Sequence, residues 1–321
     1  MMQLSVVADT QLVHQAWQRC ISRIFPPLSA DESTRLFHQF IRDPYTEPQR
    51  YYHNLQHLEE MLGYLAQYER GHGWHGKYAP ALMMEQEGNS SKLPNVEPHS
   101  RNAVDAVQHN WVGTVLLLSI LFHDVVYDPK RSDNEEKSAE FALDFLKTAE
   151  KQYMTSRRDM ANVASEEQPS SLLWADAQAA QFVRETTSDY ILKTKVHLSV
   201  EPAEQLRLSS PLTPSTIAKC HDDPLHVFLD LDLSILGQPD ACAYRDRYAA
   251  NIQREYSHYP QVDFLKGRSA FLSSFLNKPQ WYKSAYFFFL LEAQARRNVA
   301  EELAELATQL KEVESAAVPP P

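Results

Sequence analysis

Glycine is scarce in this sequence, which has 8 glycines in 321 residues. Glycine supplies the positive φ angles of tight hairpins, so a fold built from many β-hairpins is disfavoured. Residues that form helices readily, such as leucine, alanine, glutamine and glutamate, are frequent instead. The composition therefore predicts an all-α fold.

Cysteine is also rare, and the three cysteines lie far apart without a CxxC pair: Cys20, Cys220 and Cys242. This spacing excludes a disulfide scaffold and a zinc ribbon. The first residues lack the basic flank and the continuous apolar stretch of a secretory signal. We therefore expect a cytoplasmic protein.

Basic residues are in the minority, with 31 Lys and Arg against 42 Asp and Glu, and the formal net charge is −11. A negative surface repels nucleic-acid backbones and anionic lipids, so neither general nucleic-acid binding nor membrane binding is expected. A small phosphorylated ligand held at a metal ion is compatible with this charge.

Long apolar runs are missing as well. The longest, residues 112–122 (VGTVLLLSILF), is shorter than the roughly 20 residues of a membrane-spanning helix, and it predicts a buried core helix. The sequence also has no P-loop, no GxGxxG after a strand, no GxSxG and no HExxH. These absences argue against nucleotide kinases, dehydrogenases, serine hydrolases and zincin proteases.

Apolar residues at helical spacing predict a series of helices, over residues 11–25, 29–43, 54–68, 111–122, 134–153, 177–197, 244–256, 264–276 and 281–313. Residues 227–237 alternate like a strand, but their helical surroundings favour a short helix. Two polar segments read as insertions, near residues 71–108 and 154–175. We expect N-terminal helices over 1–44, a core over 45–240, C-terminal helices of the same domain over 241–315, and a disordered tail over 316–321.

Four motifs contain residues suited to bind a metal ion: Tyr52-His53-Asn54-x-x-His57, His123-Asp124, Thr194-x-x-His197 and Asp230-Leu-Asp232-Leu-Ser234. A divalent cation that activates water needs nitrogen and oxygen ligands, some of them anionic. Burying Asp124 at the end of an apolar helix is costly without a cation. His53 and His57 are four residues apart, which would place them on one helix face.

In these motifs the sequence resembles the HD superfamily of metal-dependent phosphohydrolases, and more narrowly a branch known as predicted HD phosphohydrolases. The matching segments are YHNxxH at residues 52–57, FHDxVYDPxxxDNEExSA at 122–139, TxxH at 194–197, DxDLxILG at 230–237, and Arg254-Glu-Tyr with Gly267-Arg268. The similarity spans residues 45–300, apart from the two insertions. It implies an HD-type helical bundle with additional C-terminal helices.

The resemblance implies that His57, His123, Asp124 and Asp232 hold one divalent ion, which would be Mn, Mg, Zn, Fe or Ni, with a second ion as an alternative. YHNxxH followed by DLS also resembles cyclic-nucleotide phosphodiesterases, and by that similarity His53 is the candidate general acid. The alternative for His53 is a histidine bonded to backbone at a helix N-terminus.

Two glutamates match the DNEE element of that branch. Glu135 and Glu136 are candidates to orient the attacking water, with Glu136 as the catalytic choice, and the alternative is a favourable interaction with a helix dipole. Asp230 is expected to cap a helix or to support a ligand rather than to bind the metal.

Further residues are candidates to hold the phosphate of a substrate. Lys130, Arg254 and Arg268 carry the positive charge that suits phosphate oxygens, although the two arginines fit structural ion pairs equally well. His197 would contact phosphate, bind a second metal or cap a helix.

The sequence thus predicts an enzyme that hydrolyses a phosphate ester or anhydride of a small substrate, a nucleotide among the options, through a metal-activated water. One alternative is a metal- or nucleotide-binding HD protein without turnover. Another is a two-iron oxygenase, which needs more histidines than the motifs supply. The aromatic segment 286–289 is expected in the core, with a homodimer contact as the minority interpretation.

Overall fold

The computed structural model describes residues 10–74, 77–78, 80–82, 103–160, 172–207, 213, 217 and 220–316. These residues form helices and turns without a strand among them, so the predicted all-α fold is confirmed. The chain divides into two compact units, one of Met1–Glu47 with Leu55–Lys195 and one of Pro48–Asn54 with Val196–Pro321. Residues 196–240, which we grouped with the core, thus belong to the same unit as the C-terminal helices.

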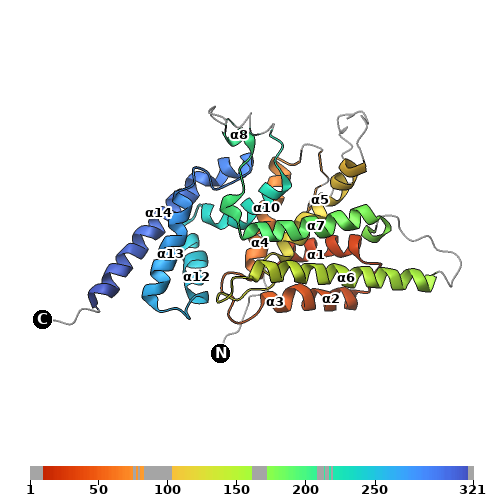
Figure 1. Ribbon diagram of the computed structural model, residues 1–321, viewed down its shortest axis with the longest axis horizontal. Helices are drawn as coiled ribbons and strands as arrows, with labels where there is room; N and C mark the ends of the chain where they lie inside the picture. The colour runs from red at the N-terminus through yellow and green to blue at the C-terminus, as the bar shows by residue number, and fades with distance from the viewer. Residues whose placement is uncertain are drawn as a thin grey trace. The chain divides into compact units, whose positions relative to one another are not determined.

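The first unit is a helical bundle (Figure 1). Its helices are α1 (Gln11–Ile24), α2 (Ala30–Phe37), a π-helical segment (His38–Arg42), α3 (Asp43–Tyr45), α4 (Leu55–Gly71), α5 (Ala103–Phe122), α6 (Asn134–Met160) and α7 (Ala177–Thr194). Helix α7 packs against both α5 and α6, and α1 packs against α4 and α5.

The apolar helix is buried as predicted, since every residue from Trp111 to His123, on α5 and just beyond it, lies in the interior. Phe145 of α6 contacts the rings of Phe25, Phe40 and Phe122 at centroid distances of 5.4, 5.1 and 5.0 Å. No helix in the described part of the chain is long and apolar enough to cross a membrane.

Helices begin at the predicted residues where the sequence contains a capping motif. Ser29 caps α2 through a capping box with Glu32, as its position before the periodic residues predicts. The chain stays helical through Pro44, which lies near the N-terminus of α3 where its missing N–H costs little.

Both predicted insertions are shorter than expected. Helix α5 already begins at Ala103, and α6 continues to Met160 instead of ending near Tyr153. Trp174 is buried and its indole Nε1 donates to Ile24 O at 2.5 Å, so this end of the second insertion belongs to the core. Residues 83–102 and 161–171, and the predicted tail beyond residue 316, lie outside the described residues.

The second unit holds the remaining helices. They are α8 (Glu204–Arg207), α10 (Pro224–Asp232) with a 3₁₀ turn (Leu233–Gly237), α11 (Ala241–Ala243), a π-helical segment (Tyr244–Ala249), α12 (Ala250–Glu255), α13 (Gln261–Leu276) and α14 (Ala285–Ala316). The segment whose alternation resembles a strand is helical, as predicted from its helical surroundings. Asp223 caps α10 and Pro224 opens it, a combination that favours a helix start.

A buried carboxylate ties α10 to the segment before α14. Asp230 is completely buried and accepts hydrogen bonds from Lys283 N at 2.6 Å, Ser284 N at 2.7 Å and Ser284 Oγ at 2.6 Å. Burial raises the pKa of Asp230 to about 8, against the opposing effect of these donors. Asp230 therefore organises the fold, in agreement with the supporting role expected for it.

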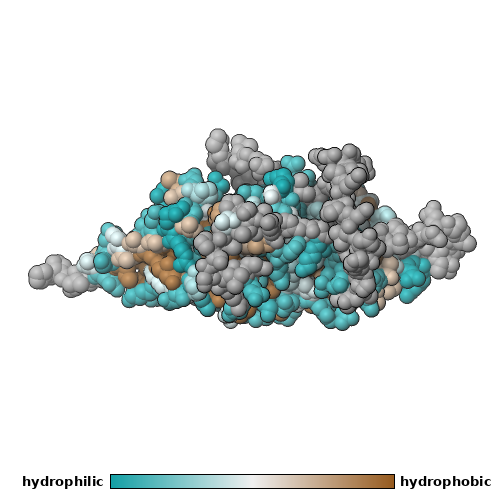
Figure 2. Space-filling view, turned by 90° about the horizontal axis from the view of Figure 1, so that it is seen from above, coloured by the Kyte–Doolittle hydropathy of each residue, from teal (hydrophilic) through white to brown (hydrophobic). Residues whose placement is uncertain are grey.

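Hydrophobic side chains reach the surface on the two C-terminal helices, which pack against each other. The exposed ones are Phe271 and Leu276 of α13 and Phe289 and Leu290 of α14. Figure 2 shows hydrophobic residues gathered over this part of the surface. Phe287 is buried, so the aromatic segment 286–289 is divided between core and surface, and the homodimer contact stays a prediction.

We predict opposite effects for two glycine-to-alanine substitutions. A Cβ at Gly237 would lie 2.6 Å from Leu291 Cβ, so Gly237→Ala should destabilise the protein by about 1–3 kcal/mol. Gly63→Ala is the control, because a Cβ at this position on α4 would meet no atom within 4 Å and alanine should stabilise the helix by about 0.5–1 kcal/mol. Urea denaturation measures both, and equal effects would contradict the packing described for Gly237.

Candidate metal centre

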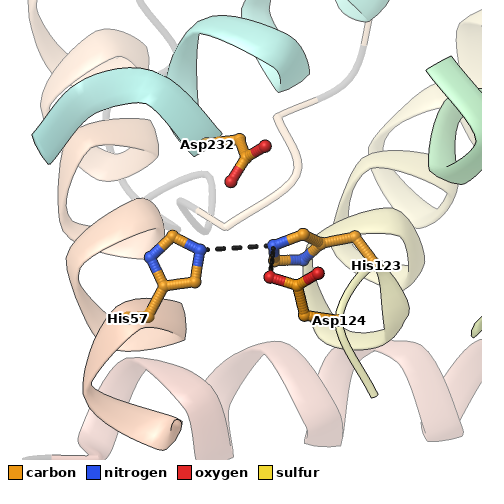
Figure 3. Close-up of side chains that lie close together, drawn as sticks. All are labelled: His57, His123, Asp124 and Asp232. Atoms are coloured by element: carbon orange, nitrogen blue, oxygen red, sulfur yellow. Dashed lines mark hydrogen bonds and ion pairs between the residues drawn. The ribbon is translucent and has the colours of Figure 1, made fainter. Parts of the chain in front are cut away.

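Three side chains of the first unit converge at the end of α5. His57 lies in the first turn of α4, and His123 and Asp124 directly follow α5. His57 and His123 are 3% and 1% exposed. His57 Nε2 and His123 Nε2 are 3.2 Å apart, and His123 Nε2 is 3.0 Å from Asp124 Oδ2 (Figure 3).

The hydrogen bonding of His123 determines which ring nitrogen can bind a metal. Its Nδ1 lies 3.0 Å from Ile120 O, and a carbonyl oxygen only accepts, so Nδ1 carries the hydrogen. In a neutral ring Nε2 then carries a lone pair, directed toward a second imidazole nitrogen and a carboxylate. Without a metal, His57 Nε2 donates its hydrogen to this lone pair, and a divalent cation that replaces the hydrogen can be bound by both nitrogens.

Asp124 is held by its backbone and by the turn that follows it. Its N–H lies 3.3 Å from Tyr45 Oη. In the next residues, Val126 N donates to Ser138 Oγ at 3.1 Å and Asp128 N donates to Asn134 Oδ1 at 3.1 Å. The start of α6 thus fixes the acidic turn after the His-Asp pair.

Asp232, at the end of α10, is half-buried and belongs to the second unit. In the group His57, His123, Asp124 and Asp232, one ligand atom of each residue lies within 4.8 Å of the others, and this group could hold a metal ion. Two imidazoles and two carboxylates suit Zn, Fe, Mn or Ni. Within the described residues no second group of this kind occurs, and His197 is not a member of the one found.

His53 does not share a helix face with His57, which corrects our expectation. Helix α4 begins at Leu55, and His53 precedes it in a non-helical segment. The physical reason is Glu255, whose Oε1 accepts the N–H groups of Tyr51, Tyr52 and His53 at 2.8, 2.7 and 3.0 Å. These donors bind a carboxylate instead of continuing the helix.

Glu255 also binds the imidazole of His53. His53 Nδ1 lies 2.6 Å from Glu255 Oε2, and the Glu255 side chain is fully buried. Burial alone would raise the pKa of Glu255, but the hydrogen bond and charge of His53, with the backbone donors, outweigh it and lower the pKa to about 2. Glu255 is therefore an ionised partner that orients His53.

The two glutamates at the start of α6 have different surroundings. Lys195 Nζ donates to Glu136 Oε1 at 2.6 Å and to Ser132 O at 2.5 Å, and its hydrogen bond lowers the pKa of Glu136. Glu135 is less exposed, at 28% against 43% for the Glu136 side chain. Burial raises the pKa of Glu135, and the charge of Asp124 adds to this effect.

The candidate phosphate-binding residues differ in burial and in their partners. Lys130 is exposed in the turn after Asp128. Arg254 is exposed too, and its guanidinium lies 5.9 Å from the Tyr51 ring. Arg268 is buried and pairs with Glu302 at 2.8 Å, which is the structural alternative that the sequence left open.

His197 is buried in the second unit rather than exposed at a helix end. It opens a 3₁₀ turn (His197–Ser199) and caps no helix through its side chain. Both of its ring nitrogens are buried without a hydrogen-bond partner.

Sequence reasoning missed two residues, Glu255 and Lys195. The Arg254-Glu-Tyr segment is among the matching motifs, but only its arginine was predicted to contribute to the site. For Lys195, the position directly after Thr194 in the TxxH motif was the available signal. Both residues act on others far away in the sequence.

Comparison of the chain with protein-family models, with curated protein sequences and with solved structures gives no match. The resemblance to the HD superfamily therefore depends on the sequence motifs. The His/Asp cluster is compatible with an HD domain.

We predict that Glu255 makes part of the protein's free energy of unfolding depend on pH in the acidic range. Its pKa falls from 4.5 to about 2 on folding, so its contribution is complete above pH 4.5 and is lost as pH falls toward 2. The difference in unfolding free energy between wild type and Glu255→Gln should shrink by on the order of 2–3 kcal/mol between pH 5 and pH 2. Urea denaturation across this range tests it, and parallel pH profiles would refute the assignment.

Proposed function

We propose that this protein is a metal-dependent phosphohydrolase, which cleaves a phosphate ester or anhydride of a small phosphorylated substrate. The observation that carries the proposal is the convergence of two buried imidazoles and a carboxylate, those of His57, His123 and Asp124, which are ligand types that bind a divalent cation. When bound, a divalent ion would supply Lewis acidity for attack of water on phosphorus. The HD-type motif order supports this reaction class.

His57, His123, Asp124 and Asp232 would hold the ion. The Nδ1–H of His123 is bound to a backbone carbonyl, which keeps Nε2 available and fixes the ring orientation. Tyr45 and the α6 turn hold the backbone around Asp124, so the ligands are positioned before the ion binds.

His53 is suited to donate a proton to the leaving oxygen. The ionised carboxylate of Glu255 holds the hydrogen on Nδ1 and stabilises the protonated ring. Nε2 is then the ring atom that exchanges a proton with the substrate. This is the relation between a catalytic histidine and its orienting carboxylate in other hydrolases.

A carboxylate at the start of α6 would orient the attacking water. The motif match favoured Glu136, but its ion pair with Lys195 occupies both of its oxygens, at 2.6 and 2.8 Å. Glu135 is more buried and experiences the charge of Asp124. These surroundings favour Glu135 for this role, with Lys195 and Glu136 positioning it.

We predict that Asp124→Asn weakens metal binding by more than about 100-fold, because an amide is a poor ligand compared with a carboxylate. Asp222→Asn is the matched control. Asp222 belongs to a second His-Asp dipeptide, His221-Asp222, and accepts a hydrogen bond from Ala285 N at 2.8 Å, a bond that an amide oxygen can keep. Elemental analysis after dialysis measures bound metal, and equal metal in both variants would refute the site.

We predict that His53→Gln lowers kcat by roughly 10²–10⁴-fold without loss of metal, because it removes the proton donor. Glu255→Gln should lower kcat less and shift the pH profile of kcat, since it acts through His53. A panel of phosphorylated metabolites provides the assay. Turnover that survives Asp124→Asn would refute the proposal, and metal binding without turnover on any substrate would favour the non-catalytic alternative.

A further inference from the structure

Two tyrosines of the π-helical segment (Tyr244–Ala249) point into the interior of the second unit. Tyr244 and Tyr248 are 4% and 7% exposed, and their ring centroids are 5.4 Å apart. π-Helical turns are rare in proteins and frequently occur at functional sites. The metal centre described above uses neither tyrosine, so the contacts of their side chains need an explanation.

A buried ion pair binds the hydroxyl groups of both tyrosines. Arg268 of α13 and Glu302 of α14 are each 7% exposed, and two guanidinium nitrogens of Arg268 donate to the two oxygens of Glu302 at 2.8 and 3.2 Å. Tyr244 Oη donates to Glu302 Oε2, and Arg268 Nη1 donates to Tyr248 Oη at 3.3 Å. Arg268 Cζ also lies 4.8 Å from the ring centroid of Tyr248. Because such a two-bond pair has a fixed geometry, it fixes the position of the Tyr248 ring.

The ring of Tyr248 packs against the segment that contains His53. Its centroid lies 4.8 Å from that of the Tyr52 ring, and the two ring planes meet at 71°. The Tyr52 ring lies 5.0 Å from the imidazole of His53, with an angle of 82° between the planes. Both are edge-to-face contacts within the range of favourable aromatic pairs. Tyr52 is itself 7% exposed, so its ring is packed between buried neighbours and has little freedom to move.

The imidazole of His53 thus has two kinds of support. Glu255 Oε2 lies 2.6 Å from His53 Nδ1, and this hydrogen bond fixes one atom of the ring. A single hydrogen bond leaves the plane of the ring free to tilt, and the edge-to-face contact with Tyr52 restricts that tilt. We propose that Tyr248 is a positioning residue for His53, because its ring holds the Tyr52 ring in contact with the imidazole while Glu255 binds Nδ1.

This role rests on the proposed function, in which His53 donates a proton to the leaving oxygen. A proton donor must lie within hydrogen-bond reach of the atom that it protonates, and a misplacement of about 1 Å can lower the rate by about 100-fold. The position of the imidazole can also be followed without turnover. The carboxylate of Glu255 stabilises the protonated ring, so a looser contact between the two groups lowers the pKa of His53.

Tyr248→Leu tests the role, because it removes the ring and keeps an apolar side chain. The pKa of His53 is measured by NMR on the imidazole resonance that His53→Gln eliminates, and it should fall by about 0.5–1 pH unit. The value of kcat should fall by about 10-fold, with KM within about twofold, since Tyr248 acts through His53. Tyr248→Phe keeps the ring and loses only the bond from Arg268, so it should retain the wild-type pKa of His53 and about half of kcat or more.

Phe275→Leu is the matched control for the loss of a buried ring in the second unit. Phe275 of α13 is 3% exposed, and its ring contacts those of Phe271 and Trp281 at centroid distances of 5.3 and 5.4 Å. This variant should lose stability to urea, as Tyr248→Leu does, and leave the pKa of His53 unchanged. If Tyr248→Leu does not fold, Tyr52→Leu takes its place, and the same fall in the pKa of His53 is expected.

The NMR measurement separates this role from the proposed activity. A wild-type pKa of His53 in Tyr248→Leu would overturn the assignment of Tyr248. An equal fall in Phe275→Leu would overturn it too, because that result would show a general loosening of the unit. A fall confined to Tyr248→Leu, in a protein that turns over no substrate, would support the positioning of His53 by Tyr248 and reject the phosphohydrolase.

Discussion

The convergence of His57, His123 and Asp124 is the constraint on which the candidate site depends. Two buried imidazole nitrogens lie 3.2 Å apart, and one of them also faces a carboxylate oxygen. Because the other nitrogen of His123 is committed to Ile120 O, the neutral ring cannot donate a hydrogen bond toward either neighbour. His57 Nε2 therefore supplies the hydrogen between the two rings, and a divalent cation that replaces it would be held by both imidazoles and the carboxylate.

Buried and half-buried acidic side chains bind backbone N–H groups in both units. Glu59 accepts the first N–H groups of α1, and Glu69 accepts those of residues 81 and 82. In the second unit Asp230, Glu255 and Glu292 each bind two or more backbone N–H groups in non-helical segments. Some of the acidic residues that give the protein its negative net charge thus stabilise the fold. Their charges do not lie on the surface, where they would repel anionic ligands.

Local patterns predicted the helices well and the long-range contacts poorly. The Ser29 capping box and the apolar run before His123 contain their own signals, so the start of α2 and the end of α5 were found. The expected helix face shared by His53 and His57 was wrong, because Glu255, about 200 residues later, binds the intervening backbone. The length of α6 was underestimated, since an exposed polar helix and a polar loop have similar compositions.

The two units are not contiguous in the chain, because the second includes residues 48–54 as well as everything after Lys195. A fragment cut at residue 196 would leave the carboxylate of Glu255 buried without the three N–H groups and the imidazole that it normally accepts from. Dissection into independently expressed halves is therefore unsuited to this protein. A fragment in which residues 48–54 are fused to the C-terminal helices would restore these donors to Glu255.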